Sequence, residues 1–236
     1  MAHSSFTTPQ GERAGYLGRP DGAGPWPGVV AIHEIFGLDQ NMRDLSDRLA
    51  AMGYLTFAPD FFNGGNWRKC MRVAFRELKA GEGEFFDAID AARAWLEPHD
   101  DCTGQVGVIG FCLGGGFALM VAPRYAFGAA SVNYGEVPDD SEQMLRGSCP
   151  VVASYGGRDR SLRGHPERLE AALTTNGVDH DIKTYPAAGH SFLSTRQWPM
   201  PVRILGKLNG MNGAPHPESA ADAWQRIDAF FRKHLA

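Results

Sequence analysis

One of the four cysteines of the chain, Cys112, lies inside a glycine-rich string, GFCLGGG, from residue 110 to residue 116. A run of β-branched residues precedes this string and a helical pattern follows it, so Cys112 is predicted to lie on a sharp turn from a strand into a helix. Gly110 and Gly114 allow the close approach of strand and helix that such a turn demands. The helix N-terminus favours a thiolate, and the N–H of Leu113 is placed to bind an oxyanion. These features predict that Cys112 is a nucleophile.

Two other interpretations of this turn remain open. A single cysteine is often a small, buried apolar residue with no chemical role. A glycine-rich turn after a strand can also bind a dinucleotide, but the spacing here is not GxGxxG and the turn does not belong to an opening βαβ unit. The residues that follow favour the nucleophile.

An acid and a base follow Cys112 in the order that acyl transfer in α/β enzymes uses, namely nucleophile, acid and histidine. Asp159 lies in GGRD, just after an expected strand that ends near Tyr155, and His190 lies in AGHSF, just after one that ends at Tyr185. Each residue alone has an ordinary explanation, as a turn or capping residue. Their joint placement at one edge of the sheet predicts a Cys112, His190 and Asp159 triad.

A fourth chemical group follows the first strong strand, in the string IHEIFG from residue 32 to residue 37. The backbone N–H of Ile35 is predicted to be the second oxyanion donor, because a tetrahedral intermediate needs two convergent N–H groups. Glu34 would either oppose a nearby thiolate by like-charge repulsion or accept the proton of the thiol. Its alternative interpretation is a surface carboxylate.

The elements that must position these groups follow from the alternation of β-branched runs with amphipathic stretches, which is typical of parallel strands joined by crossover helices. Strands are expected at residues 28–32, 54–58, 106–110, 129–134, 150–155 and 181–185. Helices are expected at residues 42–52, 68–79, 84–96, 114–121, 168–176 and 219–234. The pattern predicts an α/β fold in which helices flank both faces of a mostly parallel sheet, formed by a single domain of residues 1–236.

Residues 196–217 contain Pro, Gly and Asn and show no sustained hydrophobic period. The segment is long for an ordinary connection between two elements. It is expected to be either a lid over the site or a packed surface excursion.

Composition excludes several other classes of protein. Apolar residues make up 43% and charged residues 21% of the chain, as in an ordinary globular protein, and the net charge of −4 gives no reason to expect a nucleic-acid partner. The N-terminus lacks the layout of a signal peptide, and no apolar run is long enough to span a bilayer. The four cysteines form no CxxC pair that would suggest a metal or dithiol site. The protein is expected to be cytoplasmic, with no membrane or nucleic-acid partner, and to be a monomer or small homo-oligomer.

Five strings together resemble the dienelactone hydrolase family of α/β-hydrolases over nearly the whole chain. They are HEIFGL at 33–38, GYLTFAPDFF at 53–62, GFCLGGG at 110–116, GGRD at 156–159 and AGHSF at 188–192. The resemblance implies a Cys-His-Asp triad of Cys112, His190 and Asp159, and a glutamate, Glu34, that interacts with the thiol in the resting enzyme. It further implies hydrolysis of an unsaturated lactone that carries a carboxylate, with no metal or organic cofactor.

The sequence departs from the family pattern at the expected substrate pocket. Members of the family place an arginine shortly after the HSF string, where this chain has Ser194, and Arg196 is the nearest substitute. A second substrate arginine would correspond to one of three residues on a predicted helix, namely Arg68, Arg72 or Arg76. The candidate substrate contacts are Phe36, Trp67, Arg68, Phe192 and Arg196.

The sequence therefore predicts a hydrolase that cleaves a small ester or lactone through a thioester on Cys112. A general carboxylesterase or thioesterase with a reshaped pocket is the first alternative. A non-catalytic relative that senses thiol reagents or binds a ligand is the second; it predicts that Cys112 reacts with peroxide while no ester is turned over.

Overall fold

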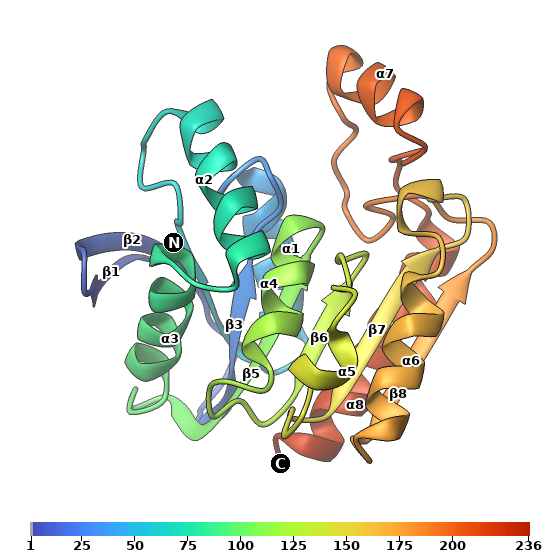
Figure 1. The fold of residues 1–236 in the computed structure, drawn as a ribbon. Helices are drawn as coiled ribbons and strands as arrows, with labels where there is room; N and C mark the ends of the chain where they lie inside the picture. Colours follow the sequence, from blue (N-terminus) through green and yellow to red (C-terminus); the bar gives the residue numbers. More distant parts are fainter. Residues whose placement is uncertain (1) are drawn as a thin grey trace.

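Eight strands form one sheet in the computed structural model, which describes residues 2–236 (Figure 1). The strands are β1 (Ala2–Thr8), β2 (Gly11–Gly18), β3 (Trp26–Ile32), β4 (Leu55–Pro59), β5 (Cys102–Phe111), β6 (Ala130–Asn133), β7 (Val151–Gly156) and β8 (His180–Tyr185). Their order across the sheet is β1-β2-β4-β3-β5-β6-β7-β8. The pairs from β4 to β8 are all parallel, and β1 and β2 add an antiparallel edge.

Eight α-helices connect or flank these strands. They are α1 (Gln40–Ala51), α2 (Trp67–Ala80), α3 (Glu84–Leu96), α4 (Leu113–Val121), α5 (Ser141–Met144), α6 (His165–Thr175), α7 (Met200–Leu208) and α8 (Pro217–His234) among residues 2–236, with a short 3₁₀ helix at Arg160–Leu162. No helix in this part of the chain is both long enough and apolar enough to cross a bilayer.

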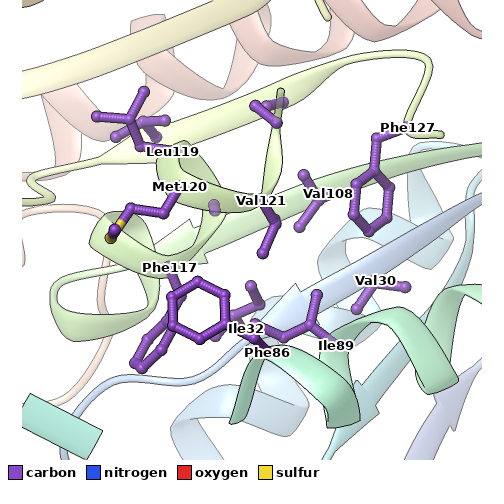
Figure 2. Close-up of a cluster of buried hydrophobic side chains, with 14 of the residues drawn as sticks. Val30, Ile32, Phe86, Ile89, Val108, Phe117, Leu119, Met120, Val121 and Phe127 are labelled. Carbon is purple, nitrogen blue, oxygen red and sulfur yellow. The ribbon is translucent and has the colours of Figure 1, made fainter. Parts of the chain in front are cut away.

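Alternate side chains of each central strand enter two separate cores. On β3, Val30 and Ile32 pack toward α3 and α4, as Figure 2 shows, whereas Val29 and Ala31 belong to the core that α1 and α8 cover. This alternation follows from the two-residue period of a strand that is buried on both faces. The expected fold, a mostly parallel sheet with helices on both faces, is confirmed.

All twelve expected strands and helices are present, with ends that differ by a few residues. The largest differences are that β5 begins at Cys102 instead of residue 106, and that α6 covers His165–Thr175 instead of residues 168–176. The hairpin of β1 and β2 was not expected. Residues 196–217, which show no sustained hydrophobic period, contain one regular element, the helix α7 at Met200–Leu208.

The parallel strands all end at one edge of the sheet, and the loops at this edge carry the residues with predicted chemistry. Cys112 directly follows β5, the 33–38 loop follows β3, and Asp159 and His190 lie beyond β7 and β8. In open α/β sheets, sites form at the carboxyl ends of the strands.

Candidate active site

Cys112 occupies a strained turn between β5 and α4. Its backbone angles are φ 56° and ψ −116°, a region that a residue with a side chain rarely adopts. The turn is held by its own backbone, because the N–H of Cys112 donates to the carbonyl of Asn133 at 3.0 Å and its carbonyl accepts from Gly115 at 3.0 Å. Packing around the turn leaves no space for a side chain at Gly110, where a methyl group would overlap with the carbonyl oxygen of Gly114.

Replacing Gly110 by alanine is therefore expected to destabilise the fold by ~3 kcal/mol or more, which corresponds to a fall in Tm of about 10 °C. The rigid backbone of the turn cannot move aside for the added methyl group. Gly116→Ala is the matched control in the same string, because a methyl group there meets only the flexible Leu78 side chain at 3.0 Å. Thermal unfolding of both variants checks the prediction, and equal Tm values would contradict it.

His190 and Asp159 form a buried pair at the same edge. The Nδ1 atom of His190 lies 2.6 Å from Oδ2 of Asp159, and the two side chains are 5% and 0% exposed. The other carboxylate oxygen, Oδ1, accepts hydrogen bonds from the N–H of Ser161 at 3.1 Å and from its hydroxyl at 2.5 Å. These contacts fix the carboxylate, and the carboxylate in turn fixes the orientation of the imidazole ring.

The second imidazole nitrogen, Nε2, is the one that remains for Cys112. It makes no regular hydrogen bond with any described residue. Cys112 is among the groups that act on the titration of His190, so the sulfur lies near the ring. Burial by itself lowers the pKa of His190, but the negative charge of Cys112 and the hydrogen bond to Asp159 outweigh burial and raise this pKa. A thiolate at Cys112 thus stabilises a protonated imidazole beside it.

Two backbone N–H groups near the sulfur are free to bind an oxyanion. Among the described residues, neither the N–H of Leu113, at the start of α4, nor that of Ile35 donates a hydrogen bond. The two segments lie against each other, because a side chain at Gly114 would overlap with the carbonyl oxygens of Ile32 and His33. The structure therefore brings both expected donors to the Cys112 turn.

Glu34 is buried close to Ser191 and His190 instead of lying on the surface. It is 3% exposed, and neither carboxyl oxygen makes a regular hydrogen bond within residues 2–236. Burial raises the pKa of Glu34, against the opposing effects of the Ser191 hydroxyl and the charge of His190. Burial raises the pKa of the Tyr134 hydroxyl. The charges of Glu34 and Cys112 raise it further, so Tyr134 lies close to both. A protonated Glu34 removes the repulsion that a carboxylate would exert on a thiolate.

Backbone strain is concentrated around this cluster. Three of the five non-glycine residues described with positive φ are Cys112, Tyr134 and Ser191, with φ angles of 56°, 43° and 56°. Each such residue costs about 1–3 kcal/mol and persists only where the surrounding structure holds it. Sequence reasoning missed both Tyr134, which ends the strand expected at 129–134, and Ser191, which directly follows His190.

Ser194, which stands where family members have an arginine, has a structural role in this protein. Ser194 is buried, and its hydroxyl donates to Oδ1 of Asn41 at 2.9 Å. The N–H groups of Thr195 and Arg196 donate to the same oxygen at 3.1 Å and 3.3 Å. Asn41, at the start of α1, thus fixes the course of the chain up to Arg196.

Arg196 lies near the site but is already paired. Its guanidinium group lies 2.5 Å from the carboxylate of Asp39 and 4.7 Å from the centre of the Phe36 ring. Its charge still reaches the site, where it is one of the influences that lower the pKa of Glu34 against the larger effect of burial. The expected substrate contacts Phe36 and Arg196 therefore lie together, with the positive charge of Arg196 balanced by Asp39.

Trp198 completes the surroundings of the base and was also missed from the sequence. Its ring lies 5.8 Å from that of His190 and 6.5 Å from that of Phe36. The segment that carries Trp198 also holds His190 through its backbone, because the N–H of His190 donates to Met211 at 2.9 Å and the N–H of Ala214 donates to His190 at 3.2 Å. Part of the 196–217 segment is thus a support for the base.

The other expected substrate contacts are placed differently. Phe192 is buried in the core between the rings of Tyr134 and Tyr185. Trp67 donates from Nε1 to the carbonyl of Ile35 at 2.5 Å, so it borders the loop that carries the oxyanion donor. Arg68 is exposed and lines a shallow hollow of about 520 Å³ on α2, formed by residues 66–76. Cys112, His190 and Asp159 are not part of this hollow.

Within residues 2–236, no group of three or more His, Cys, Asp or Glu side chains is arranged to hold a metal ion.

Comparisons with known proteins assign the family. Residues 14–235 match the family described as "Dienelactone hydrolase family". A protein of Yersinia pestis, provisionally named a carboxymethylenebutenolidase, is 30% identical over 94% of this chain and 84% of that protein. A similarly named protein of Synechocystis is 29% identical over 94% of this chain and 92% of that protein.

A solved structure from Klebsiella pneumoniae, provisionally named a dienelactone hydrolase, superimposes with a TM-score of 0.76. It is 27% identical, and the match covers 98% of each chain. With the family match over residues 14–235, these similarities show that the chain belongs to the dienelactone hydrolase family and is a hydrolase of the ester or lactone type.

Proposed function

We propose that the protein hydrolyses a small carboxylic ester or lactone through a thioester on Cys112. The observation that carries the proposal is the polar chain from Asp159 through His190 to Cys112, in which the acid holds Nδ1 at 2.6 Å and leaves Nε2 for the sulfur. This is the relation between acid, base and nucleophile that acyl transfer needs.

In the first half of the reaction the Cys112 sulfur attacks the carbonyl carbon and forms a C–S bond. The oxyanion is stabilised by the N–H groups of Leu113 and Ile35, which need no rearrangement to receive it. Collapse of the intermediate breaks the C–O bond, and protonated His190 gives its proton to the departing alkoxide. In a lactone this alkoxide stays attached to the acyl group.

The second half regenerates the thiol. Neutral His190 takes a proton from water, the water attacks the thioester carbonyl, and the thiolate departs as the acid product forms. Asp159 stabilises the positive imidazole in both halves. Glu34, whose pKa is raised by burial, interacts with the sulfur in the resting enzyme, and the hydroxyl groups of Tyr134 and Ser191 lie near its carboxyl group.

The pairing of Arg196 with Asp39 favours a neutral ester as the second candidate substrate. A free arginine next to Phe36 would bind the carboxylate of an anionic lactone, but here Asp39 neutralises that charge at 2.5 Å. The protein is therefore expected to hydrolyse neutral esters such as p-nitrophenyl acetate at least as well as an anionic lactone.

Replacing Asp39 by asparagine is expected to raise kcat/KM for an anionic lactone about tenfold relative to the neutral ester, because it frees the positive charge of Arg196. Asparagine can still accept the hydrogen bond from the N–H of Met42, which caps α1 at 3.0 Å, so the helix is retained. Steady-state rates on both substrates check the prediction. Arg196→Gln is the paired variant, and it should lower the rate on the lactone relative to Asp39→Asn. A wild-type protein that turns over neither substrate would contradict the proposed function itself.

A further inference from the structure

The large apolar side chains that are exposed in this protein gather on two helices. Six such side chains are exposed among the described residues, and all of them lie on α2 or α7: Trp67, Phe75, Met200, Ile204, Leu205 and Leu208. Four are more than half exposed, and Leu208 reaches 79%. Exposed apolar side chains that gather on one or two elements mark an interaction surface.

On α7, the apolar side chains form a stripe on the outer face of the helix. Met200, Ile204 and Leu208 are four residues apart and therefore lie above one another. The opposite face packs inward at Gly206, where a side chain would overlap with the ring of Trp198. Trp198 thus supports the helix from below, and the apolar stripe points away from the rest of the protein.

Both helices are also positively charged. The exposed face of α2 carries five cations, Arg68, Lys69, Arg72, Arg76 and Lys79. Its one acid, Glu77, is buried, and burial raises its pKa. Residues 196–217 contain three cations and no acid. The chain as a whole has a net charge of −4, so this distribution is a local excess of positive charge.

The two helices lie at the same end of the molecule as the candidate active site. Figure 1 shows α2 and α7 at the end toward which the parallel strands point, with α7 projecting beyond the sheet. Both are attached to the same loop, since Trp67 donates to Ile35 at 2.5 Å and Trp198 packs 6.5 Å from Phe36. A surface that contacts both helices would therefore lie above the 33–38 loop, at the edge of the sheet that carries Cys112.

We propose that α2 and α7 dock this protein on the surface of an anionic lipid bilayer, with the Cys112 site facing the lipid. The helices combine an apolar stripe with lysine and arginine side chains, which is the pattern of a segment that lies in the interface of a membrane. Anionic head groups complement the cations, and the upper part of the acyl chains accepts the apolar side chains. A second copy of the chain fits less well, because joining two such faces would bring like charges together.

The proposed contact is peripheral, and it does not depend on hydrolysis. The expectation that no membrane is involved came from the lack of a segment that could span a bilayer, and none is present in residues 2–236. A surface helix needs no such segment.

The test is co-sedimentation with vesicles of phosphatidylcholine alone and of phosphatidylcholine mixed with phosphatidylglycerol. The wild-type chain is expected to bind the anionic vesicles at least tenfold more tightly, and added salt should weaken this binding. Lys69→Glu with Lys79→Glu should weaken it about 25-fold or more, since each cation near the surface contributes ~1 kcal/mol. Ile204→Ser with Leu205→Ser should abolish it.

Arg146→Glu is the matched control, because Arg146 is exposed but lies outside both helices. It should bind like the wild type, and all variants should keep the far-UV circular dichroism and the rate on a water-soluble ester. Equal binding to both kinds of vesicle, or none to either, overturns the proposal. So does a dimer in lipid-free solution that Ile204→Ser with Leu205→Ser dissociates, since the apolar stripe would then contact a second copy.

Discussion

Replacing Cys112 by alanine is expected to reduce kcat/KM for any ester substrate by about 10⁴-fold or more while the fold remains intact. In the proposed mechanism the sulfur forms the new bond in the first step, and alanine supplies no nucleophile in its place. Alanine also fits the site sterically, because it removes atoms from a strained turn without adding any. Steady-state rates with p-nitrophenyl acetate measure the loss, and thermal unfolding measures the fold.

Cys70→Ala is the matched control for this variant, since Cys70 is also a half-buried free cysteine but lies on α2. It should retain wild-type turnover. Intact-mass measurement after rapid acid quenching should show one acyl adduct in the wild type and in Cys70→Ala, and none in Cys112→Ala. A folded Cys112→Ala protein with near wild-type turnover would show that another group performs the chemistry.

The order and type of the central elements could be predicted from the sequence because their signals are local. A strand buried on both faces, such as β3 or β5, must be a continuous run of apolar residues, and its neighbours must be amphipathic helices. The edge hairpin of β1 and β2 lacks this signal and was missed. Strands at an edge are partly exposed, so apolar and polar residues alternate less clearly along them. The helix α7 was missed because Pro199, Pro201 and Gly206 lie in a stretch whose apolar face points to solvent instead of toward a core.

The candidate site was predictable to the extent that its residues lie at strand ends. Cys112, Asp159 and His190 each follow a parallel strand, so topology alone brings them to one edge. Tyr134 has the same placement, but tyrosine at the end of a strand has no signal that separates a buried hydroxyl near a thiol from ordinary packing. The ion pair of Arg196 could not be predicted from the sequence, because its partner Asp39 is more than 150 residues away in the chain.

The residues around Cys112 combine two unfavourable features, namely positive φ angles and buried polar atoms without hydrogen bonds in residues 2–236. Cys112, Tyr134 and Ser191 adopt positive φ angles, while Glu34, Tyr134, Ser191 and His190 present buried polar atoms without regular hydrogen bonds among the described residues. Both features are unfavourable for stability, and they persist because the flanking β-strands fix the backbone. We infer that these unpaired atoms are the partners of the substrate and of the hydrolytic water, which explains their retention in a buried site.

Replacing Asp159 by asparagine is expected to lower kcat by about 10³–10⁴-fold, although the two side chains have the same shape. The carboxylate accepts a hydrogen bond from Nδ1 at 2.6 Å and so keeps Nε2 available to the sulfur. An amide group can donate a hydrogen bond to Nδ1. It thereby selects the imidazole tautomer with its proton on Nε2, and in that tautomer Nε2 cannot act as a base. The amide also lacks the negative charge that stabilises imidazolium in both halves of the reaction.

The charge effect can be separated from turnover in the Cys112→Ala background, where the sulfur no longer influences the ring. Hydrogen bonding and charge from Asp159 both raise the pKa of His190 in the native protein, so Asp159→Asn should lower that pKa in an NMR titration of the imidazole. Ser161→Ala is the matched control, because it removes one hydrogen bond to Oδ1, at 2.5 Å, but keeps the charge. It should cost no more than about tenfold in kcat. Similar losses in Asp159→Asn and Ser161→Ala would mean that the carboxylate positions the loop and does not stabilise the protonated base.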